Sequence, residues 1–121
     1  MKKLKIFLVE DDPMMVSLLK TLLELEGYRV NNPPLNRANI IGTLLKEDPD
    51  LILMDVLLGR INGLDVLKKM KTIEQLKNKK ILMTSGTNLE VECMRAGADG
   101  FIMKPYMPDE LMKKIQLLTN G

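Results

Sequence analysis

The chain has 121 residues, of which 45% are hydrophobic and 28% are charged, and its formal net charge is +2. These values are typical of one globular domain with a single sizeable core. The near balance of 18 basic and 16 acidic residues excludes the composition of a dedicated nucleic-acid binder. One cysteine, Cys93, excludes an internal disulfide. The sequence shows no leader or membrane-spanning run, so we expect a cytoplasmic protein without membrane contact.

Short apolar runs alternate with segments of helical spacing along the whole chain. In chain order the pattern predicts a strand at 5–9, a helix at 14–27, a strand at 28–30, a loop at 31–36, a helix at 38–48, a strand at 51–54, a helix at 63–76, a strand at 80–84, a short helix at 89–97, a strand at 100–103 and a helix at 108–118. The apolar runs are continuous rather than alternating, which indicates strands covered on both faces. Five βα units therefore predict one doubly wound α/β domain over 1–121.

The second predicted strand is followed only by Asn31 and Asn32, whereas acidic, hydroxyl or basic side chains follow the other four. Because the carboxyl ends of parallel strands meet at one edge of the sheet, where ligands bind, we expect these side chains to be neighbours. They are Glu10, Asp11 and Asp12 after the first strand, Asp55 after the third, Thr84 and Ser85 after the fourth, and Lys104 after the fifth.

This edge carries an excess of negative charge. Asp12 precedes Pro13, and this pair is a standard helix start, so we interpret Asp12 as an N-cap. Glu10, Asp11 and Asp55 repel one another unless a cation joins them, and Lys104 supplies only one positive charge. The chain has no histidine, and carboxylate and water oxygens are the ligands that Mg²⁺ prefers. The residues therefore predict a magnesium site.

A hard cation beside an aspartate, a hydroxyl and a lysine is typical of phosphoryl-transfer chemistry. Asp55 is the best candidate nucleophile, because it stands alone at the end of the central strand and a carboxylate can form an aspartyl phosphate. The chain contains neither of the glycine-rich motifs that bind nucleotide phosphates, G-x-x-x-x-G-K-[ST] and G-x-G-x-x-G. We therefore expect the donor to be a small phosphate compound or another protein.

The segments FLVEDD, DLILMD with GLDVL, ILMTSG and AGADGFIMKP occur in this order over essentially the whole chain. Together they resemble the receiver domain of two-component response regulators, similar in outline to the chemotaxis type. The resemblance implies a flavodoxin-like three-layer (βα)5 sandwich with parallel strands in the order 2-1-3-4-5. It also implies a signalling module rather than an enzyme, with turnover limited to its own phosphorylation and slow autodephosphorylation.

The resemblance further implies a role for each matching position. Asp55 would be the phosphoacceptor, and Lys104 would pair with the phosphoryl group. Ser85 would hydrogen-bond it and act as a switch together with Phe101. The Mg²⁺ ligands, with Mn²⁺ as a substitute metal, would be Asp11 directly, Glu10 through water, Asp55 and the backbone carbonyl of Leu57. The Lys104–Pro105 bond would be cis. The partners implied are a histidine kinase or phosphotransfer protein and a downstream effector, with a phosphorylation-dependent dimer and no direct nucleic-acid binding.

Several positions keep a simpler interpretation. Ser85 could only end a strand, and Phe101 could only be core. Thr87 and Glu90 match an S/T-x-x-E capping box, and Asn62 precedes a helix start. The lysines of 68–80 are interpreted as a solvated face, with a docking patch for an acidic partner as the alternative. Ser85 and Lys104 lie closer in sequence than is usual in the family, which predicts a short helix at 89–96.

Three other functions compete with phosphorylation. A degenerate receiver would bind partners without being phosphorylated, but the acidic, hydroxyl and lysine positions are all intact. A magnesium phosphatase would need a general acid two residues after Asp55, where this chain has Leu57. A flavodoxin-like cofactor binder would need a phosphate-binding loop after the first strand, where this chain has acids.

Overall fold

The computed structural model describes residues 3–34 and 39–120. The main elements confirm the predicted alternation of strands and helices. In chain order they are β1 (Lys5–Val9), α1 (Pro13–Leu25), β2 (Arg29–Asn31), α2 (Ile40–Glu47), β3 (Leu51–Asp55), β4 (Leu57–Leu58), β5 (Ile61–Asn62), α3 (Gly63–Met70), β6 (Lys80–Ser85), α4 (Glu90–Arg95), β7 (Gly100–Met103) and α5 (Pro108–Asn120).

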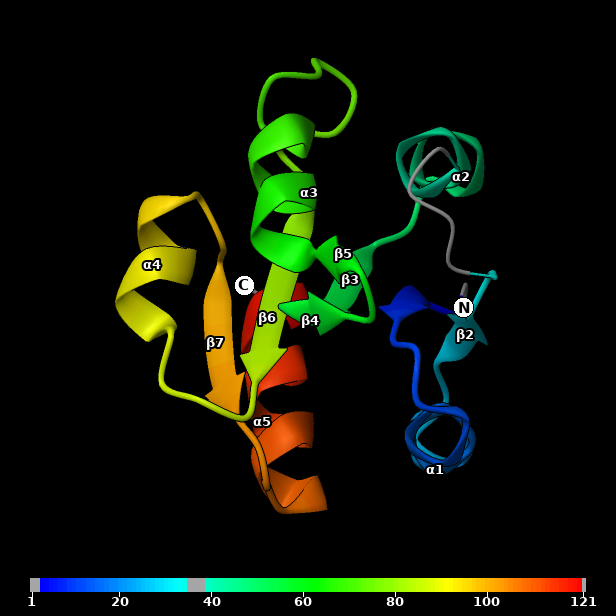
Figure 1. Cartoon of the computed structure of the whole chain (residues 1–121). Coiled ribbons are helices and arrows are strands. Elements are labelled where there is room, and N and C mark those ends of the chain that lie inside the picture. The colour runs from blue at the N-terminus through cyan, green and yellow to red at the C-terminus, as the bar shows by residue number, and fades with distance from the viewer. Residues whose placement is uncertain (1–2, 35–38, 121) are drawn as a thin grey trace.

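Five of the strands form one parallel sheet in the order β2-β1-β3-β6-β7. Counted among the strands of this sheet alone, this is the order 2-1-3-4-5 that the resemblance implied, so the flavodoxin-like fold is confirmed (Figure 1). The sequence did not predict β4 and β5, which pair antiparallel in the loop after Asp55. Each has two residues, too few to show an apolar period.

Successive residues of each strand face opposite layers of core, because side chains alternate across a sheet. One layer packs α1 and α5 against Ile6, Leu8, Leu53 and Ile102. The other packs α2, α3 and α4 against Phe7, Val9, Ile52 and Met83. In Figure 1, α3 lies in front of the sheet and α5 behind it. This two-sided burial explains the continuous apolar runs in the sequence.

Two helix starts behave as the sequence predicted. The Asp12 side chain accepts a hydrogen bond from the Met14 N–H at 3.0 Å, and Asn62 accepts one from the Leu64 N–H at 2.8 Å. Each side chain satisfies a backbone donor that the first helical turn leaves free. Both caps lie beside the carboxyl ends of strands, so they also fix how α1 and α3 leave that edge.

The capping box at Thr87 and Glu90 was a wrong prediction. The helix begins at Glu90, and Asn88, not Thr87, accepts the hydrogen bond from the Glu90 N–H, at 3.3 Å. Thr87 is instead hydrogen-bonded to the end of β6, because its N–H donates to Ser85 Oγ at 3.2 Å. A nearby hydroxyl acceptor thus competes with the helix for this segment.

The predicted helix over 63–76 is too long. α3 ends at Met70, and turns follow in which Thr72 and Ile73 donate to the carbonyls three residues back. Leu76 is nevertheless buried in the core. The apolar spacing therefore predicted burial correctly but not the helical hydrogen bonds, because turns can place the same side chains inward. Asn31, the first residue of the predicted loop at 31–36, is instead the last residue of β2. Residues 35–36 of that loop, and residue 38 of the predicted helix at 38–48, lie outside the described residues.

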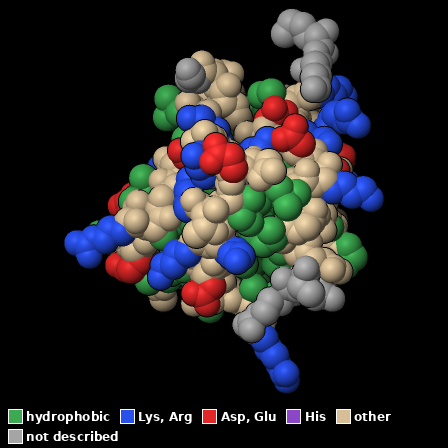
Figure 2. Space-filling view, turned by 90° about the horizontal axis from the view of Figure 1, so that it is seen from above, with side chains coloured by type: hydrophobic (Ala, Val, Ile, Leu, Met, Phe, Trp, Pro, Cys, Tyr) green, Lys and Arg blue, Asp and Glu red, His purple; other side chains and the backbone are tan. Residues whose placement is uncertain are grey.

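Charge on the face seen in Figure 2, at the amino ends of β6 and β7, is mixed, with lysine and arginine side chains interspersed among acidic ones. In the lysine-rich stretch, Lys77 pairs with Glu74 at 2.8 Å and Lys79 pairs with Asp48. This arrangement supports the interpretation of a solvated face. Among the described residues, no helix has the length and apolarity needed to cross a membrane.

Candidate functional site

Glu10, Asp55 and Lys104 meet at the carboxyl ends of β1, β3 and β7. The Lys104 ammonium donates to Glu10 Oε1 at 3.0 Å and also to Asp55 Oδ2. Glu10 and Asp55 are only 5% and 6% exposed. Strand alternation points all three side chains toward the α1 and α5 layer. The structure therefore brings together one lysine and two buried carboxylates that are far apart along the chain.

Hydrogen bonds hold the Glu10 carboxylate in its charged form. Burial by itself raises the pKa of Glu10, but the hydrogen bond from Lys104, the bond from the backbone N–H of Asp12 and the positive charge of Lys104 outweigh it and lower the pKa below its usual value. Burial lowers the pKa of Lys104, and its bonds to Asp55 and Glu10 outweigh this, so the net pKa is raised. The charged forms of Glu10 and Lys104 therefore stabilise each other.

Asp11 lies beside this cluster and is exposed. Partial burial, and then the neighbouring carboxylates of Glu10 and Asp55, raise the pKa of the Asp11 carboxyl above its usual value. One lysine thus leaves uncompensated negative charge at this point, which is an arrangement that a cation would stabilise. No group of three acidic, cysteine or histidine side chains within 3–34 and 39–120 forms a metal cluster. Mg²⁺ needs only one or two carboxylates, because water completes its shell.

The loop after Asp55 helps to fix the position of the Asp55 carboxylate. The Leu57 N–H donates to Asp55 Oδ1 at 3.0 Å, while the Leu57 side chain is 68% exposed. Gly63 begins α3 so close to the end of β3 that a Cβ on it would lie 2.2 Å from the Asp55 carbonyl oxygen. The sequence identified Gly63 only as part of a helix start. It is in fact the residue that lets the backbone approach Asp55.

Among the described residues, no hydrogen bond joins the side chain of Ser85 to the acidic cluster, and Phe101 lies in the core. Ser85 is buried at the end of β6, with its hydroxyl 3.3 Å from that of Thr87. Phe101 lies in the core layer of α2, α3 and α4. Ser85 is joined to Lys104 through the backbone, because the Lys104 N–H donates to the Ser85 carbonyl at 2.8 Å. The Lys104–Pro105 bond that follows is cis, the isomer that the resemblance implied.

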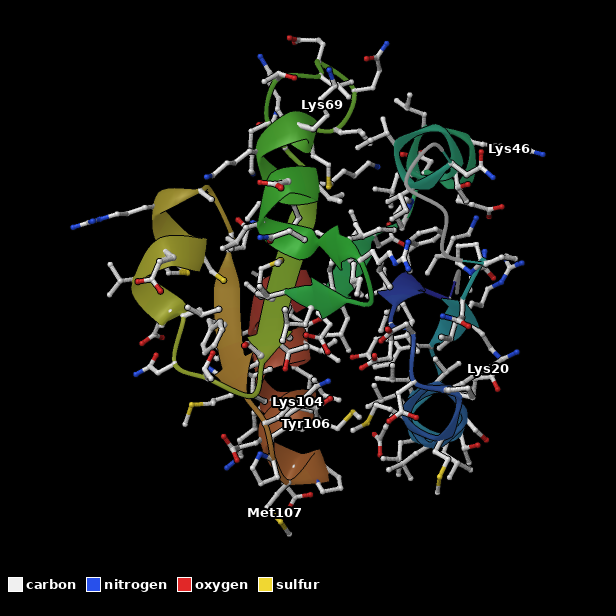
Figure 3. The ribbon with its side chains drawn as sticks, viewed as in Figure 1. Lys20, Lys46, Lys69, Lys104, Tyr106 and Met107 are labelled. Atoms are coloured by element: carbon white, nitrogen blue, oxygen red, sulfur yellow. The ribbon has the colours of Figure 1, made fainter. Side chains whose placement is uncertain are left out.

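Two buried hydroxyls lack a hydrogen-bond partner among the described residues, those of Thr84 and Tyr106. Burial raises the pKa of Tyr106 to about 12, and the charges of Lys104, Glu10 and Asp55 also act on it. Figure 3 places Lys104 and Tyr106 together at the carboxyl end of β7. Sequence reasoning missed Tyr106, although a hydroxyl-bearing aromatic two residues after Lys104 was a visible signal.

The fold and this site can be compared with known proteins. A family model, that of the response regulator receiver domain, matches residues 6–116. The chain belongs to this family. This receiver domain is 32% identical over 117 residues to the response regulator SaeR of Staphylococcus aureus, which covers 94% of this chain and 50% of that protein. The receiver domain spans about half the length of the curated relatives it matches.

Solved structures agree with the fold. A protein from Chloroflexus aurantiacus J-10-fl that is assigned to the response regulators is 26% identical, with a TM-score of 0.91 over 99% of this receiver domain and 100% of that chain. The receiver domain of the sensor histidine kinase PA1611 from Pseudomonas aeruginosa PAO1 is 24% identical, with a TM-score of 0.87 over 99% of this chain and 100% of that one. That structure has a magnesium ion coordinated in its active site cleft.

Proposed function

We propose that this receiver domain is phosphorylated on Asp55 by the phosphohistidine of a partner histidine kinase or phosphotransfer protein. One observation carries the proposal. The Asp55 carboxylate is almost fully buried, and it is held by the Lys104 ammonium on one side and the Leu57 N–H on the other. A carboxylate that is fixed in position, with a cation beside it, is prepared for attack on a phosphorus atom.

In the transfer step, an oxygen of Asp55 forms a bond to phosphorus as the bond between phosphorus and the donor histidine nitrogen breaks. The electron pair of the broken bond stays on that nitrogen. Lys104 already contacts Asp55, so its ammonium is placed to balance the charge that the phosphoryl group brings. Turnover would be limited to this self-phosphorylation and to slow hydrolysis, without a separate substrate.

A divalent cation fits the residues present. Asp11, Glu10, Asp55 and the Leu57 carbonyl would hold Mg²⁺, with Mn²⁺ as a substitute, because they offer hard oxygen ligands where negative charge is uncompensated. When bound, the metal supplies positive charge for the phosphoryl oxygens. The Pseudomonas aeruginosa receiver domain, which has the same fold, holds a magnesium ion in its active site cleft.

Phosphorylation would act as a two-state switch. Among the described residues, Thr87 is the one hydrogen-bond partner of the Ser85 hydroxyl, and Ser85 is connected to Lys104 through the backbone. We expect Ser85 to turn toward the phosphoryl group, the β6–α4 loop to repack and Phe101 to respond. The shifted population would change affinity for an effector protein or domain, or for a second copy of the receiver domain.

The direct test is incubation with acetyl phosphate or beryllofluoride plus Mg²⁺, followed by amide NMR and intact-protein mass spectrometry. We expect a mass increase of one phosphoryl group with acetyl phosphate, and amide shifts around Asp55, Ser85 and Lys104. The matched control is Asp55→Asn, which keeps the shape and removes the nucleophile. Absence of both responses in the folded native protein would support the phosphorylation-independent interaction module instead.

A further inference from the structure

The buried hydroxyl of Thr84 lies close to the acidic cluster and lacks a partner. Thr84 is 3% exposed, and among the described residues its Oγ1 atom has no hydrogen-bond partner. A buried polar group without a partner costs free energy, so native structures rarely keep one without a reason. Neither the proposed phosphoryl transfer nor the proposed metal site uses this hydroxyl.

The strand order puts Thr84 between Asp55 and Lys104. β6 lies between β3 and β7 in the sheet, and Thr84 pairs with Asp55 on one side and with Ile102 on the other (Figure 1). The Lys104 N–H donates to the Ser85 carbonyl, so the backbone of Lys104 still runs beside β6. Because side chains alternate along a strand, Thr84, Asp55 and Lys104 point to the same face of the sheet.

The Lys104 side chain therefore crosses the end of β6 to reach its partners. Neighbouring strands lie about 4.8 Å apart, and Asp55 is two strands away from β7. The Lys104 ammonium nevertheless contacts Asp55, and it also reaches Glu10 on the strand beyond, at 3.0 Å. On this face, the last residue of β6 that the lysine side chain passes is Thr84.

We propose that Thr84 is a positioning residue of the switch, whose hydroxyl gains a hydrogen bond from the Lys104 ammonium when Asp55 is phosphorylated. This inference rests on the proposed function. An ammonium has three N–H groups, and in the unphosphorylated protein they point toward the Glu10 and Asp55 carboxylates and leave the Thr84 hydroxyl without a donor.

Phosphorylation requires Lys104 to move. Both Asp55 oxygens are occupied, Oδ1 by the Leu57 N–H and Oδ2 by Lys104. The lysine is the partner that can withdraw, because the Leu57 N–H belongs to the backbone. A phosphoryl group bonded to Oδ2 takes the place of the ammonium, which draws back toward β7 and over β6. There one N–H meets Thr84 Oγ1 while the others face the phosphoryl oxygens.

The missing hydrogen bond then biases the switch. An unpartnered buried hydroxyl raises the free energy of the unphosphorylated state and not that of the phosphorylated state. The free-energy difference that phosphorylation has to overcome is therefore smaller than it would be with an apolar residue at position 84. Thr84→Val removes the hydroxyl and keeps the branched shape, so it should stabilise the unphosphorylated protein and weaken its response.

The first measurement is urea unfolding without Mg²⁺ or phosphoryl donor. Thr84→Val should raise the folding equilibrium constant about five- to thirtyfold, because it removes an unsatisfied buried group. The matched control is Thr119→Val, which removes a hydroxyl that donates to the Ile115 carbonyl at 2.8 Å and should not raise the constant. A lower constant in Thr84→Val would show that a buried water already satisfies the hydroxyl, and it would overturn the proposal.

The second measurement is a titration with beryllofluoride, a mimic of the phosphoryl group, in the presence of Mg²⁺, followed by the amide signals of Ser85 and Lys104. Thr84→Val should need about tenfold more beryllofluoride for half of the response, the equivalent of one hydrogen bond made in one state only. Thr84→Ser keeps the hydroxyl and should restore the native midpoint.

The outcomes separate this inference from the proposed function. Equal midpoints in the native protein and Thr84→Val, or a midpoint in Thr84→Ser as high as that in Thr84→Val, would overturn the role of the hydroxyl. Phosphorylation of Asp55 would then still stand. A native protein that gives no response to beryllofluoride would overturn both.

Discussion

The two edges of the central sheet both carry ion pairs, but they bury them to very different degrees. At the carboxyl edge, Lys104 bridges two carboxylates whose side chains are 4% and 8% exposed. At the amino edge, Lys79 pairs with Asp48, whose side chain is 77% exposed. Water screens the second pair and is largely excluded from the first.

This difference explains why the candidate site lies at the carboxyl edge. A charge that is already in water gains little from a partner, so pairs at the amino edge mainly keep the surface soluble. Buried carboxylates depend on whichever cation is beside them. We therefore expect the carboxyl edge, and not the amino edge, to respond to a change in charge such as an added metal or phosphoryl group.

The largest expected effect comes from removing the bridging lysine. Lys104→Met leaves Glu10 and Asp55 buried without a cation, so we expect the free energy of unfolding to fall by about 3–5 kcal/mol. The matched variant at the other edge, Lys79→Met, should cost less than about 1 kcal/mol. Urea unfolding without Mg²⁺ measures both. Similar losses in the two variants would contradict the contrast between the edges.

Metal binding gives the next largest effect. If Mg²⁺ joins the carboxyl edge, a concentration 100 times its Kd should stabilise the native protein by about 2.7 kcal/mol. Asp11→Asn should remove most of this gain. Asp50→Asn, which changes an acid that accepts the Lys5 N–H at the amino edge, should keep it. Thermal unfolding with and without Mg²⁺ measures the gain, and an equal gain in both variants would argue against the proposed ligands.

Glycine substitutions test the backbone of the two edges. Gly63→Ala forces a Cβ against the Asp55 carbonyl, so we expect a loss of about 1–3 kcal/mol and a weaker response to beryllofluoride. Gly27→Ala, after α1, meets no atom within 4 Å but has a φ of +96°, which costs about 1–2 kcal/mol. Its beryllofluoride response should be normal. Amide NMR on both variants tests whether Gly63 positions the site or only stabilises the fold.

The smallest effect concerns pH. The ordinary phenol pKa is 10.0, and burial raises that of Tyr106 to about 12. The unfolded chain therefore loses this proton first, and the folded state becomes less stable as the pH rises from 10 to 12. Tyr106→Phe should reduce this alkaline loss, whereas Tyr28→Phe serves as the control. The measurement is the free energy of unfolding of both variants across this pH range. An equal alkaline loss in the two variants would contradict burial of Tyr106 as its cause.

The sequence predicted much of the site because strand-end positions share one edge of a parallel sheet. Glu10, Asp55 and Lys104 could thus be grouped without coordinates. It could not predict that Lys104 would bridge both acids, because Lys104 and Glu10 are 94 residues apart and side-chain geometry depends on packing. Local competition explains the error at Thr87, where the Ser85 hydroxyl accepts the N–H that a helix start would otherwise use.

The amino-acid sequence was thus sufficient for the order of the helices and of the five parallel strands, the burial of both sheet faces and the caps at Asp12 and Asn62. These features depend on neighbours a few residues away, or on apolar periods that any compact packing must bury. Tertiary structure alone decided the end of α3 at Met70, the close approach of Gly63 to Asp55 and the burial of the Tyr106 hydroxyl. Each of these depends on how segments distant in sequence fill the same space.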